Sequence, residues 1–361
     1  MLRAFGSPRR YVQGPGALAE LGPQAAAFGA KPLVIGDAIV LTLLRDRLEA
    51  TLGPSFQAPG FAEFRGECTA EEIARLTAVA AASGADLVVG VGGGKAIDTA
   101  KGVSIGRRTP LIIVPTIASN DSPTSRLAVV YTDGHVLQEV RSMAANPDLV
   151  LVDTEVLVQA PARYFVSGVG DALSKKFEAA QCFASGNRNF YAANPPFIAQ
   201  TIADACYEAI RACAESALRA VRARAPNEDF ERTVEATILL SGLAFENGGL
   251  SMAHSLTRGF SVVPGIAQSL HGEQVAFGLL VQLVLEKRPA AFIDVLVAFY
   301  GSIGLPRSLH ELGLKADPVA AAGVIARDTW QRAPYVRAMT VEVTPGGIEQ
   351  ALLVAHRWTG S

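Results

Sequence analysis

Two histidines and one aspartate in the second half of the chain form a set that could hold a metal ion. Asp171, His254 and His271 each lie in a short segment rich in glycine and other small residues. One carboxylate and two imidazoles leave a position of a tetrahedral zinc site open, which is typical of catalytic zinc. The three residues are far apart in the sequence, however, and form no local metal motif. Residue types alone therefore leave two alternatives open, a metal site or three unrelated side chains.

A glycine-rich segment, GVGGGKAID at residues 90–98, follows an apolar run and precedes a helical pattern. Backbone amides of such a turn, with the N-terminus of the next helix, can bind the phosphates of a dinucleotide. The segment is no Walker A loop, because Ala96 stands where Ser or Thr is required. It also lacks the Rossmann spacing, because the candidate ribose-binding acid, Asp37, lies upstream. A tight turn that needs glycine is the alternative, but three consecutive glycines at 92–94 favour a phosphate-binding loop.

Two further polar positions follow apolar runs. Asp37 stands at the carboxyl end of a predicted strand, where a carboxylate could accept the ribose hydroxyls and repel a 2′-phosphate, so it favours NAD over NADP. A helix N-cap is the alternative for this residue. The hydroxyl-rich segment PTIASNDSPTS at 115–125 could bind a nicotinamide or a polyol, or could be a plain connecting loop.

The elements that must position these residues change in type at about residue 160. Before it, apolar runs alternate with helical patterns, which predicts β-α units around a mostly parallel sheet. Strands are expected at 32–35, 86–91, 111–114 and 149–152, a helix from Thr69 to 82, and a hairpin of 127–131 and 136–141. After it, long helical patterns predominate, and Asp171 is expected at the start of one of them, 170–183. The fold class predicted is an α/β dinucleotide-binding domain over 1–160 and an all-α metal- and substrate-binding domain over 161–361.

Composition excludes several other classes of protein. Half of the 361 residues are apolar, 18% are charged and the net charge is −2, so the chain is globular and has no basic stripe for nucleic acid. The apolar runs are too short for a membrane span, and no signal peptide is recognisable at the N-terminus. Four cysteines occur without a C-x-x-C pair, which favours reduced thiols. We expect a cytoplasmic protein that acts on a small molecule.

Five segments, in this order, resemble the signature segments of glycerol dehydrogenases: GGGKAIDTAK, PTIASNDSPTS, GVGDALS, GGLSMAHS and HGEQVAFG. That family lies within the iron-containing (group III) alcohol dehydrogenase superfamily. RYVQGPGAL and VIGD are also similar, so the resemblance covers about residues 8 to 285. It implies a dehydroquinate synthase-like two-domain architecture, NAD as cofactor, and a homo-oligomer that is often an octamer.

The resemblance also implies the roles of individual residues. Asp171, His254 and His271 match the zinc ligands, and Asp121 matches the residue that contacts substrate hydroxyls. NAD is expected to contact Asp37, Gly93, Gly94, Lys95, Asp98, Thr116, Ser119, Ser125, Leu127 and Tyr131. Iron-dependent relatives carry a histidine where Lys175 stands here, so Zn²⁺ is favoured over Fe²⁺.

The reaction implied is interconversion of a small secondary alcohol or polyol, such as glycerol, a 1,2-diol or an amino alcohol, and its ketone. Zinc lowers the pKa of the bound hydroxyl, and the zinc-bound alkoxide passes a hydride to the nicotinamide. Asn120, Ser122, Thr257 and Arg258 depart from the family pattern near the expected substrate. Arg258 or Lys175 could meet an anionic group, so a phosphorylated or specialised-pathway ketone is an alternative. An ammonium of Lys175 that faced the site would weaken metal binding, whereas an outward, solvated side chain is the commoner case.

Two alternatives come from other classes. A sugar-phosphate cyclase-like lyase would share the architecture and use NAD transiently, but it needs more basic groups around a phosphate than the sequence offers. A non-catalytic scaffold is the third hypothesis, and the complete set of candidate ligands argues against it.

Overall fold

The computed structural model describes residues 2–134 and 137–358, which fold as two compact units. One unit is α/β and consists of Gly6–Pro161 together with Ala220–Gly242. The other is helical and consists of residues 2–5, 162–219 and 243–358. Each unit is discontinuous in sequence. The 23 residues Ala220–Gly242 interrupt the helical part of the chain and pack with the α/β unit.

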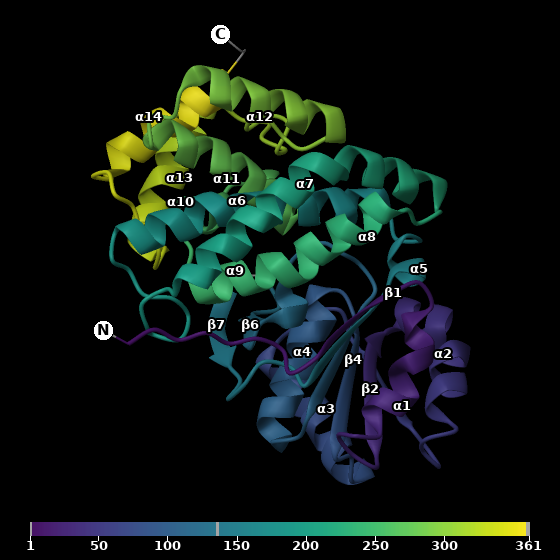
Figure 1. Ribbon diagram of the computed structural model, residues 1–361. Helices are drawn as coiled ribbons and strands as arrows, with labels where there is room; N and C mark the ends of the chain where they lie inside the picture. The colour runs from purple at the N-terminus through teal and green to yellow at the C-terminus, as the bar shows by residue number, and fades with distance from the viewer. Residues whose placement is uncertain (1, 135–136, 359–361) are drawn as a thin grey trace. The chain divides into compact units, whose positions relative to one another are not determined.

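The α/β unit contains a six-stranded parallel sheet (Figure 1). Its strand order is β1 (Tyr11–Gly14), β8 (Leu149–Asp153), β5 (Leu111–Pro115), β4 (Leu87–Gly92), β2 (Pro32–Asp37) and β3 (Gly60–Phe64). The four central strands are apolar runs buried on both faces, as a parallel sheet between helices requires. The predicted α/β fold with a parallel sheet is therefore confirmed.

Helices cover both faces of this sheet (Figure 1). On one face, Leu44 and Leu48 of α2 (Ala38–Leu52) join α1 (Leu21–Ala25) in a core that includes Val89 and Val114. On the other face lie α3 (Ala70–Ser83) and α4 (Gly94–Arg107). A Cβ on Gly90 would lie 2.6 Å from Cβ of Ala100, so glycine lets α4 approach β4 closely. The short helix α5 (Thr154–Leu157) follows β8.

The hairpin predicted after the third strand is present. Strands β6 (Leu127–Tyr131) and β7 (Leu137–Ser142) pair antiparallel, with Leu127 opposite Ser142. Two of the residues expected in this hairpin, 135 and 136, lie outside the described part of the chain. The hairpin forms a separate two-stranded sheet, and its strand β6 packs against α4, the helix that follows the glycine-rich segment.

The helical unit is built around α6 (Ala162–Ala184), α10 (Met252–Phe260) and α11 (His271–Leu285), which contact one another. Around them lie α7 (Phe197–Ala223), α9 (Ser241–Gly248), α12 (Ala290–Ile303), α13 (Pro318–Arg332) and α14 (Pro345–His356). The predicted start of a helix at residue 170 was wrong. Asp171 lies about two and a half turns inside α6, because Gly170 before it serves helix packing rather than helix termination.

The segment 220–242 that joins the α/β unit contains α8 (Glu228–Glu235), a π-helical turn (Ala236–Leu240) and the first residues of α9. Asn227 caps α8 by accepting a hydrogen bond from the backbone N of Phe230 at 2.8 Å. A π-helical turn inside a longer helix is uncommon and often lies at a functional site. Throughout residues 2–134 and 137–358, we find no helix with the length and hydropathy to cross a membrane.

Candidate metal centre and cofactor loop

Two glycines bring α6 and α11 into contact beside the candidate ligands. A Cβ on Gly170 would lie 2.6 Å from the carbonyl oxygen of Gly272, and a Cβ on Gly272 would lie 1.7 Å from that of Ser167. Any side chain at either position would push the helices apart. Because Asp171 follows Gly170 and His271 precedes Gly272, the same close approach brings these two candidate ligands together.

Asp171, His254 and His271 form a compact cluster within the helical unit, with one donor atom of each inside 4.8 Å of the others. Oδ1 of Asp171 lies 3.2 Å from Nε2 of His254 and 3.9 Å from Nε2 of His271. Donors of a tetrahedral zinc site, with bonds of about 2.0–2.1 Å, lie roughly 3.3 Å apart. The side chain of Asp171 is 1% exposed and that of His271 is 46% exposed, so solvent reaches the cluster from the His271 side.

The second carboxylate oxygen of Asp171 has no partner of its own. Oδ2 is buried and accepts no hydrogen bond within the described part of the chain. A buried, unpaired carboxylate oxygen carries a desolvation cost of several kcal/mol unless a cation or donor reaches it. The sequence-predicted trio therefore has the spacing, the donor chemistry and an unmet acceptor that a divalent metal would satisfy.

Glu178 contacts the ring nitrogen of His254 that faces away from Asp171, and this residue was not identified from the sequence. Its Oε2 lies 2.5 Å from Nδ1 of His254, and its Oε1 accepts hydrogen bonds from the backbone N of His254 and of Ser251, each at 3.0 Å. Carboxylates that hold the outer nitrogen of a ligand histidine are a recurrent part of metal sites. The signal was present, because Glu178 follows Asp171 by seven residues and so lies on the same face of α6.

Both carboxylates of the cluster are held in the charged form. Burial alone would raise the pKa of Glu178, but the charge of His254 and its hydrogen bonds lower that pKa to about 2. Burial would also raise the pKa of Asp171, but the Lys175 ammonium, together with His254 and His271, holds that pKa far below its usual range. Two ionised carboxylates thus face the ring nitrogens of the cluster.

Lys175 faces the cluster, against the expectation that an outward side chain is the commoner case. Its Nζ lies 2.6 Å from Oδ1 of Asp171 and 3.2 Å from Nε2 of His254, and the side chain is fully buried. Lys176, the next residue, points away and pairs with Glu208 at 3.2 Å. Arg258 is half-buried one turn after His254 on α10.

In the α/β unit, the glycine-rich segment forms the turn from β4 into α4. Gly92 has a φ of +152°, and a Cβ there would lie 2.8 Å from Cβ of Ala96 and 3.8 Å from Oδ2 of Asp37. Asp37 therefore lies beside this turn, at the carboxyl end of β2. Its Oδ1 accepts a hydrogen bond from the backbone N of Val40 at 2.8 Å, so Asp37 is the N-cap of α2, and its contact with a ribose stays a prediction.

The loop after β5 is fixed to α4 by a buried lysine. Nζ of Lys101 donates to the carbonyl oxygens of Ser122 (2.7 Å) and Leu127 (2.6 Å) and lies 3.2 Å from Oγ of Ser125. Asp98, expected to contact the cofactor, accepts hydrogen bonds from Oγ of Ser122 at 2.6 Å and from the backbone N of Val129 at 3.2 Å. Its carboxylate thus joins α4 to the loop and to β6, and its contact with the cofactor stays a prediction.

Asp121 lies in the same loop, which is hydrogen-bonded to the π-helical turn and to the first residue of α9. Its Oδ2 accepts a hydrogen bond from Oγ of Ser241 at 2.9 Å, and Thr124 donates to the carbonyl oxygen of Ile238 inside the π-helical turn. Among the other predicted cofactor contacts, Lys95 pairs with Glu67 at 2.7 Å. The remaining ones line the turn, the loop and β6: Gly93, Gly94, Thr116, Ser119, Ser125, Leu127 and Tyr131.

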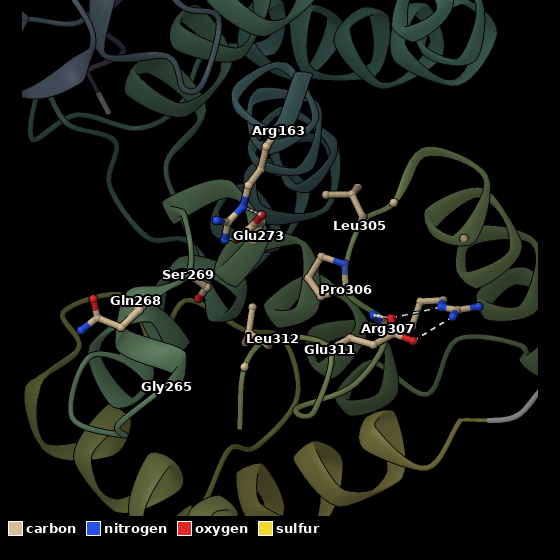
Figure 2. A pocket seen from close by; sticks show the side chains of 13 residues that line it. Arg163, Gly265, Gln268, Ser269, Glu273, Leu305, Pro306, Arg307, Glu311 and Leu312 are labelled. Atoms are coloured by element: carbon tan, nitrogen blue, oxygen red, sulfur yellow. Dashed lines mark hydrogen bonds and ion pairs between the residues drawn. The ribbon is translucent and has the colours of Figure 1, made fainter. Parts of the chain in front are cut away.

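A separate cavity of about 540 Å³ lies in the helical unit beside the start of α11, and none of the three candidate ligands lines it. Figure 2 shows that its two arginines are already paired: Arg163 with Glu273 at 2.7 Å, and Arg307 with Glu311 at 2.7 Å. Such bidentate pairs neutralise the guanidinium groups. The cavity therefore offers no free positive charge for an anion.

Comparison with known proteins adds to this geometry. Residues 8–154 match the family model described as iron-containing alcohol dehydrogenase. The chain is 37% identical to the glycerol dehydrogenase of Citrobacter freundii, over 98% of this chain and 97% of that protein. It is also 37% identical to the glycolaldehyde reductase of Halobacterium salinarum, with the same coverage of both chains.

Solved structures agree with these relatives. The chain superposes on a probable glycerol dehydrogenase from Sinorhizobium meliloti 1021 with a TM-score of 0.92, 38% identity and 98% of each chain covered. The similarity therefore extends over the residues of both units.

Proposed function

We propose that this chain interconverts a small polyol or amino alcohol and its ketone at a metal held by Asp171, His254 and His271. The chain belongs to the glycerol dehydrogenase family of the iron-containing alcohol dehydrogenases and is an NAD-dependent alcohol dehydrogenase. The observation that carries the proposal is the compact cluster of these three side chains, with a buried oxygen of Asp171 that has no partner among the described residues. A carboxylate oxygen of Asp171 and the two ring nitrogens are the donors that a divalent cation requires.

Zinc is the metal we propose for this cluster. The donor set of two nitrogens and one oxygen suits zinc, and donor spacings of 3.2 and 3.9 Å suit its tetrahedral geometry. When bound, such a cation lowers the pKa of an alcohol hydroxyl that reaches it, and so favours hydride loss from the adjacent carbon. The exposed edge of His271 leaves the substrate an approach to the cluster.

The protein's own side chains would prepare this chemistry. Glu178 holds Nδ1 of His254, which turns Nε2 toward Asp171. Asp121, fixed by Ser241, would accept hydrogen bonds from substrate hydroxyls and align them. A carboxylate that accepts such bonds favours a substrate with several hydroxyls over a simple alcohol, since each hydroxyl can donate.

The α/β unit would bind NAD at the glycine-rich turn. The amides at the start of α4 suit a pyrophosphate, and Asp37 beside Gly92 would accept the ribose hydroxyls. The negative charge of Asp37 would disfavour a 2′-phosphate, which supports NAD over NADP.

The proposal is tested by NAD⁺ reduction with glycerol, 1,2-propanediol, 2,3-butanediol and amino alcohols, before and after chelation and with zinc restored. We expect NADH to accumulate with at least one of them, to stop after chelation and to return with zinc. Activity that survives complete metal removal would exclude the metal-dependent reaction. Activity with none of these alcohols would exclude the substrate class but not the family.

A second substrate class is favoured by one relative. The glycolaldehyde reductase named above is as similar to this chain as the glycerol dehydrogenase is, so small hydroxyaldehydes with NADH belong in the same assay. The lyase alternative is distinguished there as well, because it would release phosphate from a sugar phosphate without any net change in NADH.

A further inference from the structure

A buried ammonium lies against two of the three candidate metal ligands. Lys175 Nζ is 2.6 Å from Oδ1 of Asp171 and 3.2 Å from Nε2 of His254, two of the three candidate ligands. Those two atoms are themselves 3.2 Å apart, so the ammonium sits against the same pair of donors that a cation would share. The side chain of Lys175 is fully buried.

The place of Lys175 on α6 directs its side chain toward Asp171. It follows Asp171 by one helical turn on α6, so both side chains leave the helix on the same face. The ring of Phe245 flanks the ammonium at 5.8 Å. Because a buried ammonium needs a negative partner, Asp171 holds Lys175 in the cluster as long as no other cation takes that place.

We propose that Lys175 is a built-in competitor of the metal, an internal cation that occupies part of the metal position and must swing away when a divalent ion binds. This inference rests on the proposed metal site and adds to it a residue that sets how tightly the metal is held. A divalent ion and an ammonium that share one carboxylate oxygen repel each other strongly at such short range. A metal shared by Oδ1 of Asp171 and Nε2 of His254 therefore binds only after it has displaced Lys175 from that oxygen.

Two consequences follow for the protein without metal. Lys175 neutralises Asp171 there, so the empty cluster stays folded without an uncompensated buried charge. The same contact lowers the affinity for metal, because binding has to break it. Removal of the ammonium is expected to change both properties in opposite directions.

The test compares Lys175→Met with a matched control, Lys176→Met. Lys176 is the adjacent residue on α6, and its ammonium pairs with Glu208 outside the cluster, so the control makes the same chemical change without touching the site. Each metal-free protein is titrated with zinc chloride against a chromophoric chelator, and its thermal unfolding is followed with and without zinc.

We expect the zinc affinity of Lys175→Met to exceed that of the unsubstituted protein by about tenfold or more, and the zinc affinity of Lys176→Met to be unchanged. We also expect Lys175→Met to unfold at a lower temperature without zinc and to gain more from zinc. A variant that folds only when zinc is present meets the same expectation. Lys175→Arg, which keeps the charge, should bind zinc no more tightly than the unsubstituted protein.

Equal zinc affinity in Lys175→Met and the unsubstituted protein would overturn the inference and leave the proposed metal site standing. Weaker binding in Lys175→Met would overturn it too, because Lys175 would then be a metal ligand through its neutral amine. If none of the proteins bound zinc, the metal part of the proposed function would fail, and this inference with it.

Discussion

Glu178 and His254 lie 2.5 Å apart, Oε2 to Nδ1, and this contact decides which nitrogen of the imidazole faces Asp171. Glu178 also accepts the backbone N–H of His254, so it fixes both the ring and the start of α10. The carboxylate is fully buried and ionised, with its pKa lowered to about 2. His254 is thus positioned before any metal arrives.

Glu178→Gln should weaken zinc binding by about 10–100-fold, because the neutral amide holds the imidazole less firmly and makes it a poorer donor. The measurement is a zinc titration of the metal-free protein against a competing chelator. Glu208→Gln, which changes an exposed glutamate on α7, is the matched control and should leave the affinity unchanged. Equal affinities in both variants would show that Glu178 does not support the site.

Asp37→Ser should relax the preference for NAD over NADP by about tenfold or more, measured as the ratio of the two kcat/KM values. Serine keeps the N-cap of α2, whereas the negative charge that would repel a 2′-phosphate is lost. Asp37→Ala removes the cap too, so it should also lower the free energy of unfolding by about 1 kcal/mol. A cofactor preference unchanged in both variants would leave Asp37 with the capping role alone.

Ser241→Ala should raise KM for the polyol about fivefold, because Asp121 loses the hydroxyl that donates to its Oδ2. Ser104→Ala is the matched control: it removes a buried hydroxyl that donates to the carbonyl oxygen of Thr109 at the other end of α4. Both variants should lose similar stability, and only the first should change KM. An unchanged KM in Ser241→Ala would argue against Asp121 as a substrate contact.

The sequence predicted the strands and helices whose apolar pattern is strong. The four central strands are continuous apolar runs, and each was expected within a few residues of its position. Strands β1 and β3 were missed because they are the edges of the sheet, where half-buried residues leave no apolar run. The start of α6 was misplaced because glycine marks helix ends and close helix contacts equally well.

The candidate site depended on more than local pattern. The packing of α6, α10 and α11 brings Asp171, His254 and His271 together, and the spacing of these residues in the sequence does not predict that packing. Their selection rested on resemblance to a family, and the structure then supplied the distances. The direction of Lys175 could not be predicted, since a lysine on a helix usually points to solvent and only the buried carboxylate of Asp171 draws it inward.

The four cysteines should be inert in the folded protein. All are buried, and burial raises the pKa of Cys68 to about 12 and that of Cys182 to about 11. At pH 8 these thiols stay protonated, and the thiolate that reacts with disulfide reagents forms only as the pH approaches those values. A thiol titration at pH 8 should find no fast-reacting group before denaturant is added and four afterwards. A native thiol that reacts within seconds would contradict this burial.

Gly272→Ala should damage both the fold and the metal site. Its Cβ would lie 1.7 Å from the carbonyl oxygen of Ser167, so α11 must move away from α6 and take His271 with it. We expect the free energy of unfolding to fall by at least about 2 kcal/mol and zinc to bind more weakly. The measurements are chemical denaturation of the metal-free protein and the same zinc titration.

Gly346→Ala is the control for this change, since a Cβ in that first turn of α14 would meet no heavy atom within 4 Å. It should be neutral or slightly stabilising, because alanine loses less conformational entropy on folding than glycine. If Gly272→Ala were as harmless as Gly346→Ala, the contact between α6 and α11 could not be what holds His271 beside Asp171. Lower stability with unchanged zinc affinity would separate the packing of the helices from the geometry of the cluster.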